Sequence, residues 1–193
     1  MKNICVYASS SCAVDAKYKR AARELGKLMG ENGFSLVFGG GAVGLMGELA
    51  KSLNAQNGHV VGVIPKALNI DGIAYPECDD LIVTETLRER KAVMDEKSDA
   101  FIALPGGFGT LEEILEIITL KQLKYHNKPV VIINTGGFYD ALIRQFGRIV
   151  DEMFARKESL ALYSVAETPK DAIAYIKNYK AKEIAVKWLT HVE

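Results

Sequence analysis

The sequence predicts an α/β protein with a doubly wound, mostly parallel sheet, in the three-layer α/β/α arrangement of Rossmann-like folds. The first observation is that short apolar runs suited to buried parallel strands alternate with longer runs of helical periodicity along the whole chain. The second is that no internal repeat, low-complexity segment or linker interrupts this alternation, and 193 residues suit one sizeable core. We therefore expect a single domain over residues 1–193.

The first half of the chain contains three strand-like segments and two helix-like segments. We expect strands at residues 3–8, 34–38 and 60–64, and helices at residues 15–30 and 45–57. Asn32-Gly33 is typical of the end of the first helix, and Gly58 of the end of the second. The serines at 9–11 follow the first strand, where open α/β sheets place ligands, although an N-cap with a turn explains them equally well.

The second half continues the same alternation after an irregular stretch at residues 66–80. Thr86 should cap a helix that runs to about residue 97, and Pro169 should open a C-terminal helix that ends near residue 191, with a break near residue 182 left open. The other expected helices span residues 111–123 and 139–153. The expected strands span residues 81–84, 101–104, 128–133 and 161–165.

Composition excludes several classes of protein. The 24 Lys and Arg residues balance 24 Asp and Glu residues, so no overall field attracts nucleic acid. No apolar run approaches the roughly 20 residues of a membrane span, and the N-terminal apolar run is too short for a signal peptide. Three cysteines without a CxxC spacing favour neither a disulfide framework nor a zinc site. We expect a cytoplasmic protein that binds no metal.

A glycine-rich loop follows the second expected strand. Gly39, Gly41 and Gly44 formally satisfy GxGxxG between a strand and a helix. A dinucleotide site also needs an acidic residue at the end of the next strand, but Pro65 and Lys66 stand there. The sequence therefore disfavours NAD binding, and close packing of the helix on the strand is compatible with the same glycines.

A second glycine turn, at residues 105–110, joins the strand at 101–104 to the next helix. Pro105 ends the strand, and the glycines at 106, 107 and 109 should supply positive φ values and let the backbone approach another molecule. Thr110 with Glu113 three residues later has the spacing of a capping box. A helix N-terminus of this kind favours an anion, most often phosphate, although an ordinary tight turn would use the same residues.

The same residues resemble a known family. The segment PGGFGTLEE, residues 105–113, fits the PGGxGTxxE signature of the LOG family, and Arg90-Lys91 within RERKAVM is similar to that family's second motif. The resemblance runs from the first strand to about Tyr139. LOG proteins are cytokinin riboside 5′-monophosphate phosphoribohydrolases, which were long mislabelled lysine decarboxylases. The resemblance implies a nucleotide-binding domain that hydrolyses a nucleoside 5′-monophosphate to free base and ribose 5-phosphate.

The family motifs assign roles to individual residues. The resemblance implies that Arg90 and Glu113 are catalytic. Where LOG relatives carry Met-His, Leu87-Arg88 stand in this chain, which we interpret as a change of pocket shape and charge. The substrate-binding residues implied by the resemblance are Ser10, Gly40, Gly41, Lys91, Met94, Gly107, Phe108, Gly109, Thr110, Leu111, Glu112 and Thr119.

A mechanism follows if the glycine turn holds the 5′-phosphate. Glu113 would then lie one turn away, about 5 Å along the helix axis, where it could stabilise an oxocarbenium-like transition state and orient a water molecule. Arg90 cannot be a base because an arginine side chain stays protonated, so it should bind substrate and position Glu113. AMP and N⁶-prenylated AMP both fit such a site.

The sequence also bears on two other activities and on the assembly state. A carrier that binds nucleotide or molybdenum cofactor without turnover is the main alternative, and nothing resembles the Schiff-base lysine site of a pyridoxal-phosphate decarboxylase. We expect a small-molecule nucleotide as substrate, no resident cofactor, and no nucleic-acid or membrane partner. The helix at 111–123 is apolar on more than one stripe, which together with the resemblance predicts a homodimer.

Overall fold

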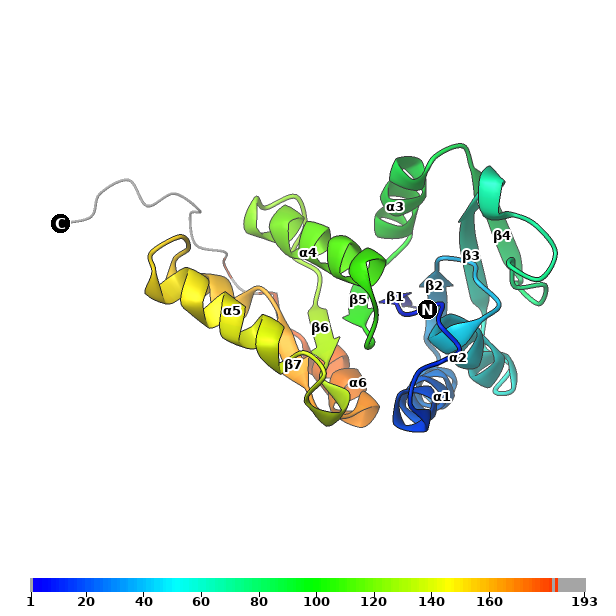
Figure 1. Ribbon diagram of the computed structural model, residues 1–193, viewed down its shortest axis with the longest axis horizontal. Coiled ribbons are helices and arrows are strands. Elements are labelled where there is room, and N and C mark those ends of the chain that lie inside the picture. The colour runs from blue at the N-terminus through cyan, green and yellow to red at the C-terminus, as the bar shows by residue number, and fades with distance from the viewer. Residues whose placement is uncertain (1, 182, 184–193) are drawn as a thin grey trace.

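The computed structural model describes residues 2–181 and 183, and their strands form one parallel sheet (Figure 1). The strand order is β4-β3-β2-β1-β5-β6-β7, so the direction of winding reverses between β1 and β5. This topology confirms the predicted doubly wound α/β fold. The strands are β1 (Asn3–Tyr7), β2 (Ser35–Phe38), β3 (Val60–Pro65), β4 (Asp80–Thr84), β5 (Ala100–Ala103), β6 (Val130–Ile133) and β7 (Ser164–Ala166).

Helices cover both faces of the sheet and complete three layers. Figure 1 shows α1 and α2 on the opposite side of the sheet from α3 and α4. The packing adds α6 to the first group and α5 to the second. The helices are α1 (Ala16–Glu31), α2 (Gly44–Asn54), α3 (Leu87–Glu96), α4 (Phe108–Gln122), α5 (Asp140–Asp151) and α6 (Pro169–Asn178), with short 3₁₀ turns η1 (Lys66–Leu68), η2 (Thr135–Gly137) and η3 (Lys157–Ala161).

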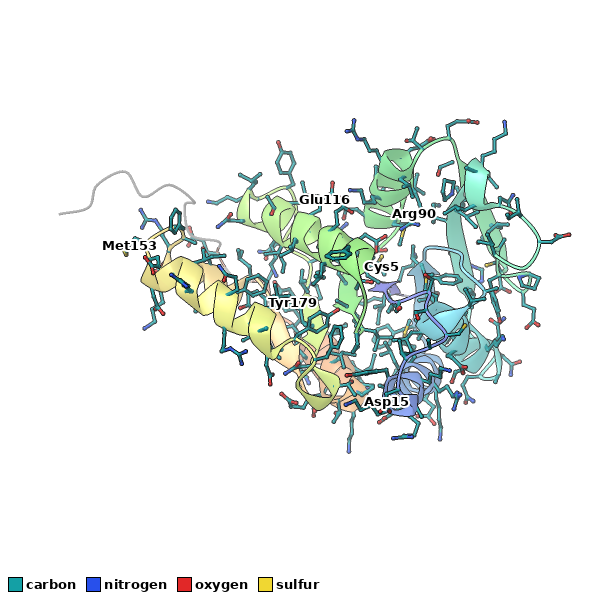
Figure 2. All side chains as sticks on the ribbon, viewed as in Figure 1. Cys5, Asp15, Arg90, Glu116, Met153 and Tyr179 are labelled. Carbon is teal, nitrogen blue, oxygen red and sulfur yellow. The ribbon has the colours of Figure 1, made fainter. Side chains whose placement is uncertain are left out.

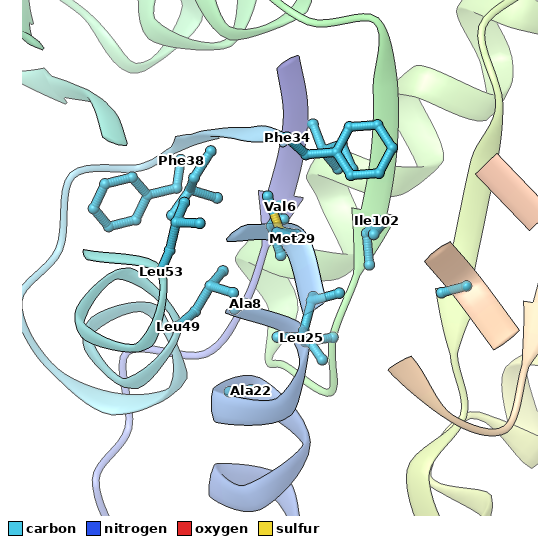
Figure 3. Close-up of a cluster of buried hydrophobic side chains, with 14 of the residues drawn as sticks. Val6, Ala8, Ala22, Leu25, Met29, Phe34, Phe38, Leu49, Leu53 and Ile102 are labelled. Atoms are coloured by element: carbon cyan, nitrogen blue, oxygen red, sulfur yellow. The ribbon is translucent and has the colours of Figure 1, made fainter. Parts of the chain in front are cut away.

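Two apolar cores lie on the two faces because alternate residues of each strand point in opposite directions. In β1, Ile4 and Val6 join the core under α1 and α2, whereas Cys5 and Tyr7 join the core under α3 and α4. Figure 3 shows part of the first core, where leucines and a methionine from α1 and α2 pack on β1 and β5. The second core supports the two helices that carry the LOG motifs.

Most helix ends agree with the sequence prediction. Gly33 has a φ of +70° just after α1, as expected for a glycine that ends a helix. The Thr86 hydroxyl accepts a hydrogen bond from the Glu89 N–H at 3.1 Å, so Thr86 caps α3 as predicted. Pro169 is the first residue of α6. No helix in the described part of the chain is long and apolar enough to cross a membrane.

Two predicted elements near the C-terminus need correction. The last strand, β7, begins three residues later than expected and ends one residue later, and residue 161 belongs to η3 instead. Helix α6 ends at Asn178, since Tyr179 is extended and its hydroxyl contacts Lys121 and Asn127. This tertiary contact overrides the helical periodicity of the sequence. The remainder of the predicted helix falls largely on residues 182 and 184–193, outside the described residues.

Candidate active site

A cleft of about 750 Å³ opens at the carboxyl edge of the sheet, beside the point where the strand order reverses. Parallel α/β sheets place their ligands at this position because the loops after adjacent strands diverge there. Four chain segments contribute to its wall. They are the end of β1 with the following serines (residues 6–11), Gly39 and Met46 around the β2–α2 turn, the first turns of α3, and the β5–α4 turn with the first turns of α4.

Arg90 and Glu113 form an ion pair across the cleft wall, from α3 to α4. The labelled Arg90 lies between these two helices in Figure 2. Their side chains are only 15% and 10% exposed. Burial raises the pKa of Glu113, and the neighbouring Arg90 charge offsets that shift only in part. The sequence prediction that these two residues act together is thus matched by their direct contact.

Lys91 makes a second set of contacts between the same helices. Its ammonium group binds Glu112 and also Glu116, the latter at 2.6 Å. Burial lowers the pKa of Lys91, but the hydrogen bonds and charges of the two glutamates outweigh burial, so the pKa is raised overall. Lys91 therefore stays protonated and fixes the spacing of α3 and α4.

The start of α4 differs from the prediction. The helix begins at Phe108 with Gly107 as its N-cap, so Thr110 lies inside the first turn and the predicted capping box is wrong. Thr110 is buried over Gly106, where an added Cβ would come within 2.1 Å of the threonine hydroxyl. None of the three glycines has a positive φ. Gly106 is required by this close approach instead, while Gly107 and Gly109 face open space.

This geometry leaves the N-terminus of α4 free to bind an anion. The Leu111 N–H is the first to bond back into the helix, to the Gly107 carbonyl at 3.1 Å, and no side chain caps the helix. The N–H groups at 108–110 therefore lack partners within the helix. They form the positive end of the helix dipole, at the side of the cleft. Phosphate is the ligand that such an arrangement favours most often.

The serine loop after β1 combines the two roles that the sequence left open. The hydroxyls of Ser9 and Ser11 accept N–H groups of their own loop, at 3.0 and 3.3 Å, so they stabilise a turn. Asp15, not a serine, caps α1. Ser10 is exposed and lines the cleft, as expected for a substrate-binding residue.

Five of the residues implied to bind substrate lie away from the cleft. Gly40 is buried against β3 with a φ of +70°, and Gly41 is buried beneath the side chain of Met46, so both serve the packing of the turn. Met94 is fully buried on the sheet. The other two, on α4, are Leu111, which packs against the second core, and Thr119, whose hydroxyl donates to the Leu115 carbonyl at 2.8 Å.

Six other residues from the resemblance do line the cleft, besides the catalytic pair and Ser10. Leu87 and Arg88 line it too, and their effect on pocket shape and charge stays a prediction. The sequence did not predict that Tyr7, Gly39 and Met46 line the cleft. For Gly39, its position just after a strand was the available signal. The cleft-lining residues implied by the resemblance are Arg90, Lys91, Gly107, Phe108, Gly109, Thr110, Glu112, Glu113 and Ser10. In the described part of the chain, no three His, Cys, Asp or Glu side chains are grouped as a metal site.

Comparisons with known proteins agree with this picture. The family described as "Possible lysine decarboxylase" matches residues 46–176. A rice protein named cytokinin riboside 5′-monophosphate phosphoribohydrolase LOG is 39% identical over 188 residues, covering 97% of this chain and 78% of the relative. An Arabidopsis thaliana protein of the same activity name, LOG2, is 39% identical over 181 residues, covering 94% and 85%.

Solved structures share the fold at lower identity. A molybdenum cofactor carrier protein from Chlamydomonas reinhardtii superposes with a TM-score of 0.70 at 25% identity, covering 91% of this chain and 96% of the other. A structural genomics target solved by X-ray superposes with a TM-score of 0.72 at 21% identity, covering 93% and 100%. The family match, the coverage of the plant relatives and the paired motifs at the cleft together show that this chain belongs to the LOG family.

Proposed function

We propose that the protein hydrolyses the N-glycosidic bond of a nucleoside 5′-monophosphate, releasing the free base and ribose 5-phosphate. The observation that carries this proposal is the buried Arg90–Glu113 pair beside the uncapped N-terminus of α4, within one cleft. The names of the plant relatives support the reaction class. AMP and N⁶-modified AMP, such as a cytokinin riboside monophosphate, are the proposed substrates.

In the proposed reaction the phosphate binds the N–H groups at the start of α4. Glu113 lies one helical turn further on, about 5 Å along the axis, so the ribose C1′ of an anchored nucleotide falls near its carboxylate. The bond from C1′ to the base nitrogen breaks, and the base leaves with the bonding electrons. Glu113 stabilises the positive charge that develops on the sugar.

Water completes the reaction from the other side of C1′. Glu113 takes one proton as the water oxygen bonds to C1′, solvent gives a proton to the departing base, and Glu113 then returns its proton to solvent, so that one water molecule is consumed overall. A glutamate whose pKa is raised by burial is a better base near neutral pH than an ordinary glutamate. Arg90 holds that carboxylate in place. Its buried Nε–H makes no hydrogen bond with the residues that the structure describes.

The cleft also has apolar surface for a base. Phe108 is 93% exposed and Leu87 is 57% exposed, and both line the cleft. Exposed aromatic and aliphatic side chains at a cleft can stack on a purine or cover an N⁶ substituent. These two residues are the proposed contacts that separate AMP from its prenylated form.

The decarboxylase description of the family is not supported by the chemistry of the cleft. Among the described residues, Lys91 is the lysine that lines the cleft. Its pKa is raised and it binds two glutamates, so it is a poor nucleophile for a Schiff base. Burial does lower the pKa of Lys121 to about 8, but Lys121 contacts Tyr179 and does not line the cleft.

A carrier that binds without turnover is the alternative, since a molybdenum cofactor carrier shares the fold. Chromatography separates the two functions. Purified protein is incubated with AMP and with isopentenyladenosine monophosphate, and free base and ribose 5-phosphate are measured. Release of base supports the proposal. Binding of AMP without release would favour the carrier.

We also propose that the protein is a homodimer. A groove of about 470 Å³ between α4, α5 and η3 is lined largely by apolar side chains, and α5 has no fully buried residue. Phe154 and Met153 stand at its rim, 83% and 54% exposed. A two-fold interface needs a surface that is complementary to itself, and this face offers both a groove and protruding side chains. Light scattering on the purified protein tests the mass.

A further inference from the structure

We propose that Arg88 is the cation that selects phosphorylated substrates, by binding the phosphate group held at the start of α4. This inference deepens the proposed function and rests on it. Sequence and family motifs assign the phosphate to the glycine turn alone. The charges of the cleft indicate that the turn needs this second group.

The charged side chains that line the cleft do not balance. Three cationic and two anionic side chains line it, so its formal charge is one positive unit. Among these lining groups, Arg90 pairs with Glu113 and Lys91 pairs with Glu112; Lys91 also binds Glu116, which does not line the cleft. Arg88 forms no hydrogen bond or ion pair with the residues that the structure describes. The whole net positive charge of the cleft therefore belongs to Arg88.

A phosphate group carries more negative charge than the N-terminus of α4 can balance. A phosphate monoester carries a charge of about −1.5 to −2 at neutral pH, whereas a helix N-terminus offers the equivalent of about +0.5. Glu112 and Glu113 lie in the first two turns of the same helix and oppose an anion there. Without Arg88 the cleft would be neutral before the phosphate arrived. Arg88 supplies the missing countercharge.

Arg88 and the start of α4 lie at the same edge of the sheet. Helices α3 and α4 both follow strands of one parallel sheet, so both begin at its carboxyl edge, and Arg88 and Gly109 each lie in a first turn. One turn further along, Lys91 meets Glu112. Residues three positions earlier on each helix, Arg88 and Gly109, both line the same cleft.

The N-terminus of α3 is capped by side chains, whereas the N-terminus of α4 is not. Helix α3 is capped by its own chain, with Thr86 accepting from the Glu89 N–H and the Glu89 carboxylate accepting from the Glu85 N–H at 2.8 Å. Its contribution to the cleft is the Arg88 side chain. Helix α4 has no side-chain cap and contributes its N–H groups. A guanidinium can bind two phosphate oxygens at once, so the two supports are complementary.

The test compares ligands with and without phosphate. Equilibrium binding of ribose 5-phosphate, and turnover of AMP and of adenosine, are measured for wild type, Arg88→Ala, Arg88→Lys and Arg20→Ala. Arg20 is an exposed arginine of α1 outside the cleft, so its variant controls for loss of one positive charge. Arg88 is exposed, so these variants should fold, which circular dichroism checks.

We expect Arg88→Ala to weaken ribose 5-phosphate binding and raise KM for AMP by about 10- to 100-fold, the range for a lost hydrogen bond to a charged group. Arg88→Lys should recover part of the loss. The kcat for AMP, the kcat/KM for adenosine and the Arg20→Ala values should stay near wild type. Added salt should weaken wild-type binding of ribose 5-phosphate more than that of Arg88→Ala.

Three results would overturn the inference. They are unchanged ribose 5-phosphate binding in Arg88→Ala, equal losses with AMP and adenosine, which would assign Arg88 to the ribose or base, and failure of wild type to bind ribose 5-phosphate. The binding arm needs no hydrolysis. If wild type releases no base from AMP but Arg88→Ala still loses ribose 5-phosphate, the proposed hydrolysis fails and the role of Arg88 stands.

Discussion

Replacing Glu113 with glutamine tests the mechanism most directly. The amide oxygen can still accept a hydrogen bond from Arg90, so the shape of the cleft is kept while one negative charge is removed. General-base catalysis is worth about 10²- to 10⁴-fold, and stabilising a developing charge about 10²- to 10³-fold. We therefore expect base release from AMP to fall by at least about a thousandfold. The dissociation constant of AMP should change by less than about tenfold, because the N–H groups that hold its phosphate are untouched.

The same change should also reduce stability. Removing one partner of a fully buried ion pair costs about 3–5 kcal/mol. The side chains of this pair are 15% and 10% exposed, and the amide keeps one hydrogen bond, so a loss of about 1–3 kcal/mol is expected. For a chain of this length each kcal/mol lowers Tm by about 2–4 °C. Activity is therefore measured at 25 °C, where the variant should remain folded.

The assay is chromatographic measurement of free base and ribose 5-phosphate, with Glu116→Gln as the matched control. Glu116 lies one turn further along α4, its side chain is 43% exposed, and Lys91 keeps Glu112 when Glu116 is changed. The control should retain turnover. A Glu113→Gln protein that releases base at the wild-type rate, or a control that loses as much activity, would refute the assignment of Glu113.

Three other predictions follow. Gly106→Ala should lower Tm because its Cβ would meet the Thr110 hydroxyl at 2.1 Å, whereas Gly107→Ala, with nothing within 4 Å, should leave Tm within about 2 °C of wild type; equal melts would contradict the packing argument. Because burial raises the pKa of Glu113 and the base must be ionised, kcat/KM should fall on the acid side at a pH above the ordinary 4.5, and a profile with its acid limb at or below 4.5 would count against this role. Met153→Glu with Phe154→Glu should shift the light-scattering mass from dimer to monomer, and an unchanged dimer would place the interface elsewhere.

Some parts of the site were predictable because they depend on local sequence. The glycine turn before α4 was predicted correctly as a strand-to-helix connection, and the family motifs named Arg90 and Glu113. The reason for the glycines was not predictable. Gly106 is required by the Thr110 side chain one turn away, and Gly40 by Ile64 on a neighbouring strand, and neither contact has a signature in a single sequence.

The sequence by itself determined the order of strands and helices, because the apolar periodicity of each segment reports which of its faces is buried. It also determined the α/β class, since alternating strands and helices leave few ways to cover both faces of a sheet. Tertiary structure alone decided which residues share the cleft. Arg90 and Glu113 are 23 positions apart on different helices, and they meet because both helices pack on one face of the sheet. It also decided that Arg88 is left without a carboxylate partner among the described residues, because a charge balance depends on every neighbour in space and not on the order of the chain.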